Sequence, residues 1–216
     1  MNGVKVGIIG IGNMGSAHLR MITGGNIPDM TVTAVCDIDT KKLNSARNTY
    51  PALRVFVDYT DLLKNSDTNA VIIAVPHPLH AKIAIEAFEY GKHVLVEKPI
   101  DITVSAAEDL CAAAEKSGKV FAIMFNQRTN GLFRKAREIV KSGELGEIKR
   151  SVWIITNWYR TQSYYDSGTW RATWRGEGGG VLLNQAPHNL DIWQWICGRP
   201  TAVTAFCNAG KFHNIE

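Results

Sequence analysis

The first 125 residues alternate short apolar runs with stretches whose apolar residues recur at helical spacing. The runs are rich in β-branched residues and occupy 4–10, 30–36, 70–75, 93–96 and 120–125. The helical stretches lie at 14–22, 79–88 and 104–114, while 53–63 fits neither pattern clearly. Runs that are apolar throughout are typical of strands buried on both faces. With right-handed crossovers, the pattern predicts α/β architecture: a doubly wound parallel sheet with helices on both faces.

After residue 125 the chain no longer alternates short apolar runs with helical stretches. The predicted elements there are helices over 132–140 and 183–197 and strands over 149–158 and 202–207. The segment 159–180 between them is dominated by Tyr, Trp, Arg and Gly. We therefore predict two domains, residues 1–125 and 126–216.

The composition is that of an ordinary globular protein, with 216 residues of which 45% are apolar and 20% charged. No apolar run approaches the roughly 18 residues that cross a bilayer, and the first residues lack the features of a secretory signal. The four cysteines are isolated in apolar surroundings, so we expect buried thiols and a cytoplasmic location. Basic residues exceed acidic ones after residue 123, but they are scattered, which argues against a nucleic-acid surface; an anionic ligand would explain the excess as well.

A glycine-rich turn stands where the first strand gives way to the first helix. It is Gly10-Ile11-Gly12-Asn13-Met14-Gly15. In a phosphate-binding turn of this spacing, the first glycine permits the tight turn and the second lets the backbone approach a pyrophosphate. The third lets helix and strand pack closely, and the helix N-terminus offers N–H groups to the phosphates. The flanking strand and helix favour a nucleotide site over a turn without a ligand.

An acidic residue, Asp37, ends the next strand, 22 residues after Gly15. A carboxylate there accepts hydrogen bonds from the adenosine ribose and repels a 2′-phosphate, which favours NAD over NADP. We therefore expect Asp37 and the adjoining Ile38 to contact the cofactor. Lys41 and Lys42 are close enough in sequence to weaken the discrimination, so NADP stays open.

The strand over 93–96 is followed by Glu97-Lys98-Pro99. Ligands of doubly wound sheets bind at the carboxyl ends of the strands. A lysine held there could protonate or polarise a carbonyl oxygen beside a nicotinamide. The simpler interpretation is a surface Glu–Lys pair at a turn.

Four motifs occur in an order and spacing that resemble one known family. They are Gly10–Gly15, the run 71–76 with His77 and His80, the Glu97-Lys98-Pro99 strand end, and Gly178-Gly179-Gly180-Val181-Leu182-Leu183-Asn184-Gln185-Ala186-Pro187-His188-Asn189-Leu190-Asp191. Together they look like the Gfo/Idh/MocA (glucose–fructose oxidoreductase / inositol dehydrogenase) family. The resemblance implies an N-terminal Rossmann domain and a second α/β domain on an open, mostly antiparallel sheet. It also implies hydride transfer between NAD(P) and a sugar, cyclitol or related polyol.

The resemblance assigns residues by matching position. Those implied to contact the cofactor are Ala74, Val75, Pro76, His77 and His80 on the adenosine and ribose side, Glu97 and Lys98 near the nicotinamide riboside, and Asn126, Trp170 and Arg171. His80 has a simpler alternative, since a histidine that opens a helix often only caps it. His18, in the first helix, is interpreted as structural.

The last predicted helix carries a polar face. At about 100° per residue, Asn184, His188 and Asp191 fall in one narrow sector. The apolar sector nearly opposite consists of Leu183, Ala186, Leu190, Trp193 and Cys197. Pro187 either lies in the first turn or kinks the helix.

The resemblance makes His188 the general base or acid of the reaction and Asn184 a substrate-binding residue. From the helix alone, a histidine on a solvated face is the favoured interpretation of His188; the glycine-rich approach and Lys98 upstream favour the catalytic one. The family commonly has Asp where this chain has Asn184, and an amide can only orient substrate through hydrogen bonds. The division of proton transfer between Lys98 and His188 therefore stays open.

The leading hypothesis is an NAD-dependent sugar or polyol dehydrogenase with Lys98 and His188 as catalytic residues. The aromatic and arginine-rich segment 153–175 would hold the polyhydroxylated ligand. The alternatives are a nucleotide- or sugar-responsive regulatory module of the same fold and, more weakly, an NADP-linked carbonyl or biliverdin-type reductase. No metal centre is expected, because His77 and His80 lack acidic or thiol partners at ligand spacing.

No nucleic-acid or membrane partner is expected, and the resemblance implies a homodimer or homotetramer. Members of the family are markedly longer than this chain. We therefore expect a C-terminal truncation, and a chain that binds NAD better than it turns over substrate.

Overall fold

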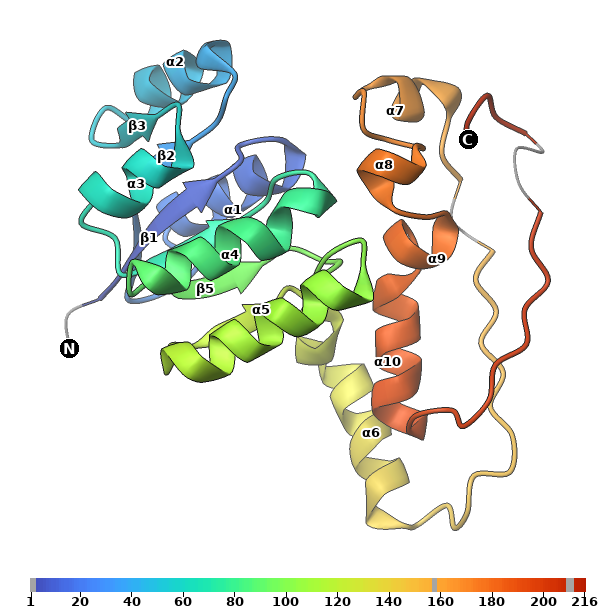
Figure 1. The fold of residues 1–216 in the computed structure, drawn as a ribbon. Helices are drawn as coiled ribbons and strands as arrows, with labels where there is room; N and C mark the ends of the chain where they lie inside the picture. The colour runs from blue at the N-terminus through green and yellow to red at the C-terminus, as the bar shows by residue number, and fades with distance from the viewer. Residues whose placement is uncertain (1–2, 157–158, 209–211) are drawn as a thin grey trace. The chain divides into compact units, whose positions relative to one another are not determined.

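The computed structural model describes residues 3–156, 159–208 and 212–216. The chain forms two units, Met1–Met124 and Phe125–Glu216, and each is described by itself (Figure 1). In the part of the chain that is described, no helix is long and apolar enough to span a membrane.

A six-stranded parallel sheet forms the centre of the first unit. Its strands are β1 (Val4–Ile9), β2 (Met30–Cys36), β3 (Arg54–Phe56), β4 (Ala70–Ile73), β5 (His93–Val96) and β6 (Phe121–Ile123). Their order is β3-β2-β1-β4-β5-β6, and every pairing is parallel. The sheet grows in one direction from β1 to β3 and in the other from β4 to β6. The doubly wound parallel sheet predicted from the apolar runs is thus confirmed.

Helices cover both faces of this sheet (Figure 1). They are α1 (Asn13–Thr23), α2 (Thr40–Thr49), α3 (Tyr59–Asn65), α4 (His80–Glu89) and α5 (Val104–Ser117), with a short 3-10 helix, η1 (His77–Leu79), before α4. The segment 53–63, ambiguous in sequence, supplies β3 and the start of α3. Asp58 explains where α3 begins, because its side chain accepts a hydrogen bond from Thr60 N.

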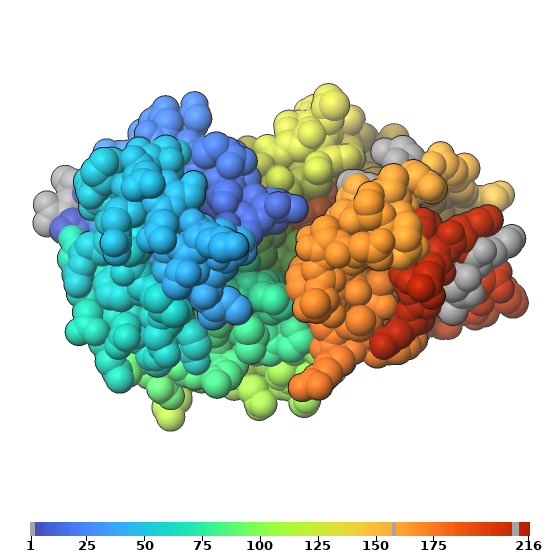
Figure 2. Space-filling model, turned by 90° about the horizontal axis from the view of Figure 1, so that it is seen from above, coloured from blue at the N-terminus to red at the C-terminus, as the bar shows by residue number. Residues whose placement is uncertain are grey.

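Two buried clusters form because successive strand residues face opposite sides of the sheet. On β1, Val6 and Ile8 pack with α1 and α2, whereas Ile9 packs with α3, α4 and α5. Seen from above, the atoms of the segments in this unit lie against one another (Figure 2, blue to green). Full burial of one such side chain contributes about 1.5–3 kcal/mol, so the two clusters hold the strand ends in a fixed register.

The register brings four strand ends into one row. Ile9 is aligned with both Cys36 and Ile73, and Ile73 is aligned with Val96. The next residues are Gly10, Asp37, Ala74 and Glu97. Gly10 N donates to Cys36 O, and Ala74 N and Glu97 N donate to Ile9 O and Ile73 O, so the ladder continues into this row. The glycine turn, the acidic residue and the Lys98 segment therefore share one edge of the sheet.

The second unit is helical in its described residues. Its elements are η2 (Asn126–Thr129), α6 (Gly131–Ser142), α7 (Gln162–Asp166), α8 (Trp174–Glu177), α9 (Val181–Asn184) and α10 (Pro187–Cys197). α6 packs against α10. There the Arg137 guanidinium lies 4.6 Å from the Trp195 ring and donates to Trp195 O at 3.1 Å.

The antiparallel sheet expected in this unit is not observed. Among the described residues of 149–158 and 202–207 there is no strand, and Asn157 and Trp158 lie outside the described residues. Ile154, Val203 and Phe206 are 77%, 81% and 98% exposed. A strand needs a hydrogen-bonded neighbour and a covered face, and these segments have β-forming residues without either.

The single helix expected over 183–197 is also wrong, because the chain forms α9 and α10 with a break at Gln185 and Ala186. Pro187 takes the first position of α10, where its missing N–H and fixed φ are tolerated. The expected apolar face is only partly correct. Ala186 is buried, but Leu190 is 45% exposed and Ile192 is the most buried side chain of α10.

The cysteines differ from the expectation of four buried thiols. Cys36 is buried at the end of β2, and burial raises the pKa of its thiol to about 12. Cys111 and Cys207 are exposed. On α5 the buried residues are Leu110 and Ala114, so the side chain that follows Leu110 turns outward.

Two glycine substitutions in the turn should differ in their effect on stability. A Cβ on Gly15 would lie 1.8 Å from Gly10 O, whereas a Cβ on Gly12 would have nothing within 4 Å. We expect Gly15→Ala to lower the free energy of unfolding by about 3 kcal/mol, because backbone must move. Gly12→Ala is the matched control and should cost about 1 kcal/mol or less. Urea unfolding measures both, and equal losses would contradict the packing role of Gly15.

Candidate functional site

The glycine turn between β1 and α1 is shaped by close backbone contacts. Gly10 has φ +87°, and a Cβ there would lie 2.6 Å from Ala74 O. Gly15 faces the carbonyl oxygen of Gly10, while Gly12 faces open space. The first and third glycines are therefore required by packing. The second leaves the backbone open to a ligand.

The N-terminus of α1, like that of α4, has no side-chain cap, unlike those of α2, α3 and α5. Asp39, Asp58 and Thr103 each cap the following helix with a side-chain oxygen, in α2, α3 and α5. α1 has Gly12 at this position and no side-chain capping bond. Helix N-terminal N–H groups that are not capped, with the positive end of the helix dipole, suit a phosphate group. The turn thus fits the pyrophosphate of a dinucleotide.

Asp37 connects the end of β2 to this turn. The residue is 8% exposed, and its carboxylate accepts hydrogen bonds from Ile11 N and Asp39 N, both at 2.9 Å. Lys42 Nζ lies 3.5 Å from it. Oδ2 accepts from Ile11 N and Lys42 Nζ, whereas Oδ1 accepts from Asp39 N and can accept a further bond, which fits the ribose role expected of Asp37. Ile38 is 88% exposed and presents an apolar surface beside it.

Glu97 and Lys98 follow β5 in the same row. Glu97 is 6% exposed, and its Oε1 lies 2.7 Å from Nε2 of His18 on α1. Lys98 is half-buried and Pro99 is buried. His18, interpreted as structural from the sequence, contacts Glu97, and this partner was not foreseen. The pair is 79 residues apart, and no local spacing in the sequence indicates it.

His80 opens α4 but does not cap it. Its side chain is 1% exposed, with Nδ1 2.7 Å from Pro99 O and Nε2 2.8 Å from Val75 O. Burial lowers the pKa of His80, while the two carbonyls and the carboxylates of Glu97 and Asp101 oppose this shift. A neutral imidazole has one N–H to donate, so it bonds one carbonyl at a time. His80 therefore connects the segments that follow β4 and β5.

The remaining residues expected on the adenosine side follow β4 directly. Ala74, Val75 and Pro76 are half-buried, and His77 is 5% exposed with its ring 5.7 Å from that of His80. Within the described part of the chain, no group of three or more His, Cys, Asp or Glu side chains could hold a metal ion.

In the second unit, the three polar residues of the expected helix face have different surroundings. Asp191 is held by the guanidinium of Arg128, with Nε donating at 2.8 Å and Nη2 at 2.5 Å. His188 is half-buried, with its ring edge-to-face to Phe125 at 6.0 Å. Asn184 is 7% exposed, lies on α9, and donates through Nδ2 to Glu177. The structure therefore does not place these residues on one solvated face.

Glu177 is a residue that the sequence analysis missed. It is 4% exposed, and its carboxylate also accepts from Ala172 N at 3.0 Å. The signal available in the sequence was a glutamate directly before Gly178-Gly179-Gly180. Nothing local predicts its burial.

Aromatic and arginine side chains cluster around Tyr164. The guanidinium groups of Arg160 and Arg171 lie 4.8 and 4.4 Å from its ring, and Arg171 Nη1 donates to Tyr164 OH at 2.7 Å. Arg171 also lies 4.6 Å from the Trp170 ring. Asn126, also expected at the cofactor, is exposed at the start of η2.

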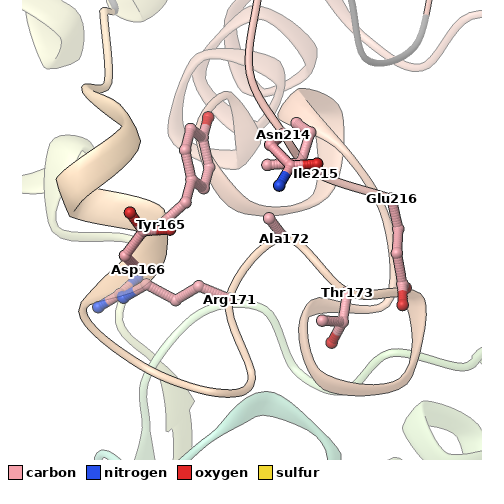
Figure 3. A pocket seen from close by; sticks show the side chains of 8 residues that line it. All are labelled: Tyr165, Asp166, Arg171, Ala172, Thr173, Asn214, Ile215 and Glu216. Atoms are coloured by element: carbon pink, nitrogen blue, oxygen red, sulfur yellow. The ribbon is translucent and has the colours of Figure 1, made fainter.

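A pocket of about 330 Å³ lies beside this cluster (Figure 3). It is lined by Tyr165, Asp166, Arg171, Ala172, Thr173, Asn214, Ile215 and Glu216. The lining mixes one guanidinium with two carboxylates and an amide, which suits hydroxyl groups better than a highly charged ligand.

Comparison with known proteins matches both parts of the chain to family models. Residues 4–125 match the GFO/IDH/MocA model described as "Oxidoreductase family, NAD-binding Rossmann fold". Residues 133–214 match the GFO/IDH/MocA C-terminal domain. The resemblance drawn from the motifs is thereby confirmed.

Individual relatives agree with these models. The chain is 29% identical over 90% of its length to the uncharacterized oxidoreductase YrbE of Bacillus subtilis, covering 54% of that protein. It is 34% identical over 67% of its length to an inositol 2-dehydrogenase of Salmonella typhimurium, covering 43% of it. The chain spans about half the length of the curated relatives it matches. Nothing in these matches favours the regulatory alternative.

Solved structures of dehydrogenases also superimpose on the chain. The WlbA dehydrogenase of Bordetella pertussis, in complex with NADH and UDP-GlcNAcA, superimposes with a TM-score of 0.82 at 26% identity, over 91% of this chain and 56% of that one. A scyllo-inositol dehydrogenase of Lactobacillus casei, with bound NAD(H) and scyllo-inositol, gives 0.76 at 28% identity over 91% and 56%.

The burial of His80 should make stability depend on pH. Its pKa lies below the ordinary 6.5 in the folded chain, so below that pH the unfolded chain takes up a proton that the folded chain does not. Acid therefore favours unfolding. We expect the free energy of unfolding to fall from about pH 7 to about pH 5, and to fall less in His80→Asn. Urea titrations across this range measure the slope.

Ile83→Val on the same helix is the control, since it removes about 1 kcal/mol of packing without removing a titrating group. It should keep the original pH slope. A His80→Asn protein with that same slope would show that His80 does not carry the effect.

Proposed function

Because the chain belongs to the GFO/IDH/MocA family of NAD-binding oxidoreductases, we propose that it forms the nucleotide-binding and catalytic part of an NAD-dependent dehydrogenase. The reaction is hydride transfer between the nicotinamide and a sugar, cyclitol or related polyol. One observation carries the proposal: the glycine turn, Asp37 and the Lys98 segment share the carboxyl edge of one parallel sheet. This edge is where doubly wound sheets bind ligands.

Cofactor binding is assigned to this row of strand ends. The N–H groups of Gly12, Asn13 and Met14 receive the pyrophosphate, and Asp37 accepts the ribose hydroxyls, which favours NAD over NADP. The exposed side chain of Ile38 covers one side of the adenosine. When bound, NAD supplies the hydride acceptor for the alcohol carbon.

We assign the catalytic groups of the reaction to Lys98 and His188. The Lys98 ammonium, at the end of β5, holds the reacting oxygen and stabilises negative charge on it. His188, at the second position of α10, takes the hydroxyl proton in oxidation and returns it in reduction, since imidazole exchanges protons near neutral pH. Asn184 orients the substrate. We extend to this chain the polyol or sugar class named for the inositol and WlbA dehydrogenases.

Lys98→Met should separate chemistry from binding. We expect NAD-dependent oxidation of a responsive polyol to fall at least about 100-fold, with the Kd for NAD changed less than about threefold. Absorbance of reduced nicotinamide across a polyol panel and fluorescence titration with NAD measure the two. Lys116→Met, an exposed lysine in the last turn of α5, is the control and should leave turnover unchanged. Tight NAD binding without turnover on any polyol would count against the proposal.

Gly12→Ala should weaken the nucleotide site without unfolding it. The added methyl group points into open space in the protein, where the proposal puts the pyrophosphate. We expect the Kd for NAD to rise by about tenfold or more, while the urea midpoint changes little. Unchanged NAD affinity would place the phosphates elsewhere.

A further inference from the structure

Two enclosed polar side chains meet directly beside Lys98. Glu97 precedes Lys98 in the chain, and its Oε1 lies 2.7 Å from Nε2 of His18 on α1. The side chains of His18 and Glu97 are 12% and 8% exposed. An ionised carboxylate can only accept a hydrogen bond, so Nε2–H of His18 donates, which both the imidazolium and one neutral tautomer allow. The contact therefore does not require a charge on His18.

The helix that carries His18 is held in place without this contact. A Cβ on Gly15 would lie 1.8 Å from Gly10 O, and Leu19 and Ile22 are buried in the cluster on that face of the sheet. His18 follows Gly15 by three residues, so the two share the helix face that packs on the sheet. Loss of the His18 imidazole would thus leave the phosphate turn where it is.

The backbone on either side of Lys98 has its own hydrogen bonds. Glu97 N donates to Ile73 O at 2.9 Å, and Pro99 O lies 2.7 Å from Nδ1 of His80. The Glu97 carboxylate is held from a different helix, and in the part of the chain that is described His18 is the side chain that donates to it. A carboxylate removed from water is destabilising without a donor. Without His18, Glu97 would turn toward water and displace the lysine that follows it.

We propose that His18 is a positioning residue for Lys98 and acts through the carboxylate of Glu97. The pair connects α1, which carries the phosphate turn, to the end of β5, which carries the lysine. It fixes the direction in which Lys98 leaves the strand, so that the ammonium group reaches the reacting oxygen. The inference rests on the proposed function and adds a residue to it. It requires that kcat depends on His18 while the Kd for NAD does not.

Two substitutions of His18 test this requirement. His18→Leu removes the donor and keeps a side chain of similar size, whereas His18→Gln keeps an N–H group that can reach Glu97. At saturating NAD and polyol, we expect kcat per NAD-binding site to fall about tenfold in His18→Leu. His18→Gln should keep kcat within about threefold of the unsubstituted chain. Absorbance of reduced nicotinamide measures kcat. Fluorescence titration counts the sites and gives the Kd for NAD, which should change less than about threefold in both variants.

A double variant tests whether the two side chains act as one unit. Glu97→Leu should lower kcat about as much as His18→Leu does, and the two substitutions together should lower it no further, because each removes the same contact. The double variant removes both polar partners, so it should be more stable than either single variant. If the single variants fail to fold, the double variant decides: it should bind NAD and show kcat lowered about tenfold.

The matched control is Ile22→Val on the same helix. It removes packing from the cluster that holds α1 but no hydrogen bond to the β5 end. It should lower the urea midpoint and leave kcat per NAD-binding site unchanged. The inference would be overturned by an unchanged kcat in His18→Leu or by His18→Gln being as slow as His18→Leu. A double variant that loses the product of the two single losses, or that keeps the original kcat, would overturn it as well.

The unsubstituted chain separates this inference from the proposed function. Absence of NAD-dependent turnover on any polyol in that chain would overturn the proposed function and the inference with it. Turnover by that chain, combined with an unchanged kcat in His18→Leu, would overturn the inference alone.

Discussion

The close approach of the first helix to the first strand is the constraint on which the nucleotide-binding unit depends. Gly15 lies against the carbonyl oxygen of Gly10, and Gly10 in turn lies against Ala74. These contacts leave no room for a side chain, so they set both the position and the direction of α1. Its uncapped N-terminus points out of the turn. One turn further on, His18 reaches Glu97 beside Lys98. A single packing contact thus connects the phosphate turn with the β5 strand end.

Buried polar groups complete the same edge of the sheet. Asp37 holds the turn through Ile11 N, and His80 lies between the carbonyls of Val75 and Pro99. Asp101 accepts from Ala81 N at 3.3 Å. Polar groups removed from water are destabilising unless they are hydrogen-bonded, and a satisfied network is correspondingly rigid. The sheet alone needs none of these side chains. Their place at the strand ends is best explained by the need for a rigid ligand site.

The amino-acid sequence was sufficient to predict those features of the fold that depend on a local pattern of residues. Continuous apolar runs gave the parallel strands, and the spacing of three glycines before a helix gave the turn. It was insufficient where a partner distant in sequence decides the outcome. The pair of His18 and Glu97 is one example. The β-rich segments around Ile154 and Val203 are another, because residues with strand propensity form a strand only when a neighbouring strand pairs with them. Pro187 correctly indicated the first turn of a helix. The helical spacing of apolar residues on both sides of it, however, could not show that the chain forms two helices there and not one.

Buried carboxylates of the chain are held either by backbone N–H groups or by side chains, and this affects how each one tolerates substitution of its neighbours. Asp37 and Asp101 accept from backbone N–H groups, which no substitution of the donor residue removes, short of proline. Glu97 and Asp191 are held by side chains, His18 and Arg128, and Glu177 accepts from the side chain of Asn184 as well as from Ala172 N. A backbone-held carboxylate can therefore keep its place while neighbouring residues change. A carboxylate held by a side chain changes only together with its partner, so Asn184 has to be interpreted with Glu177 and not as a lone replacement for aspartate.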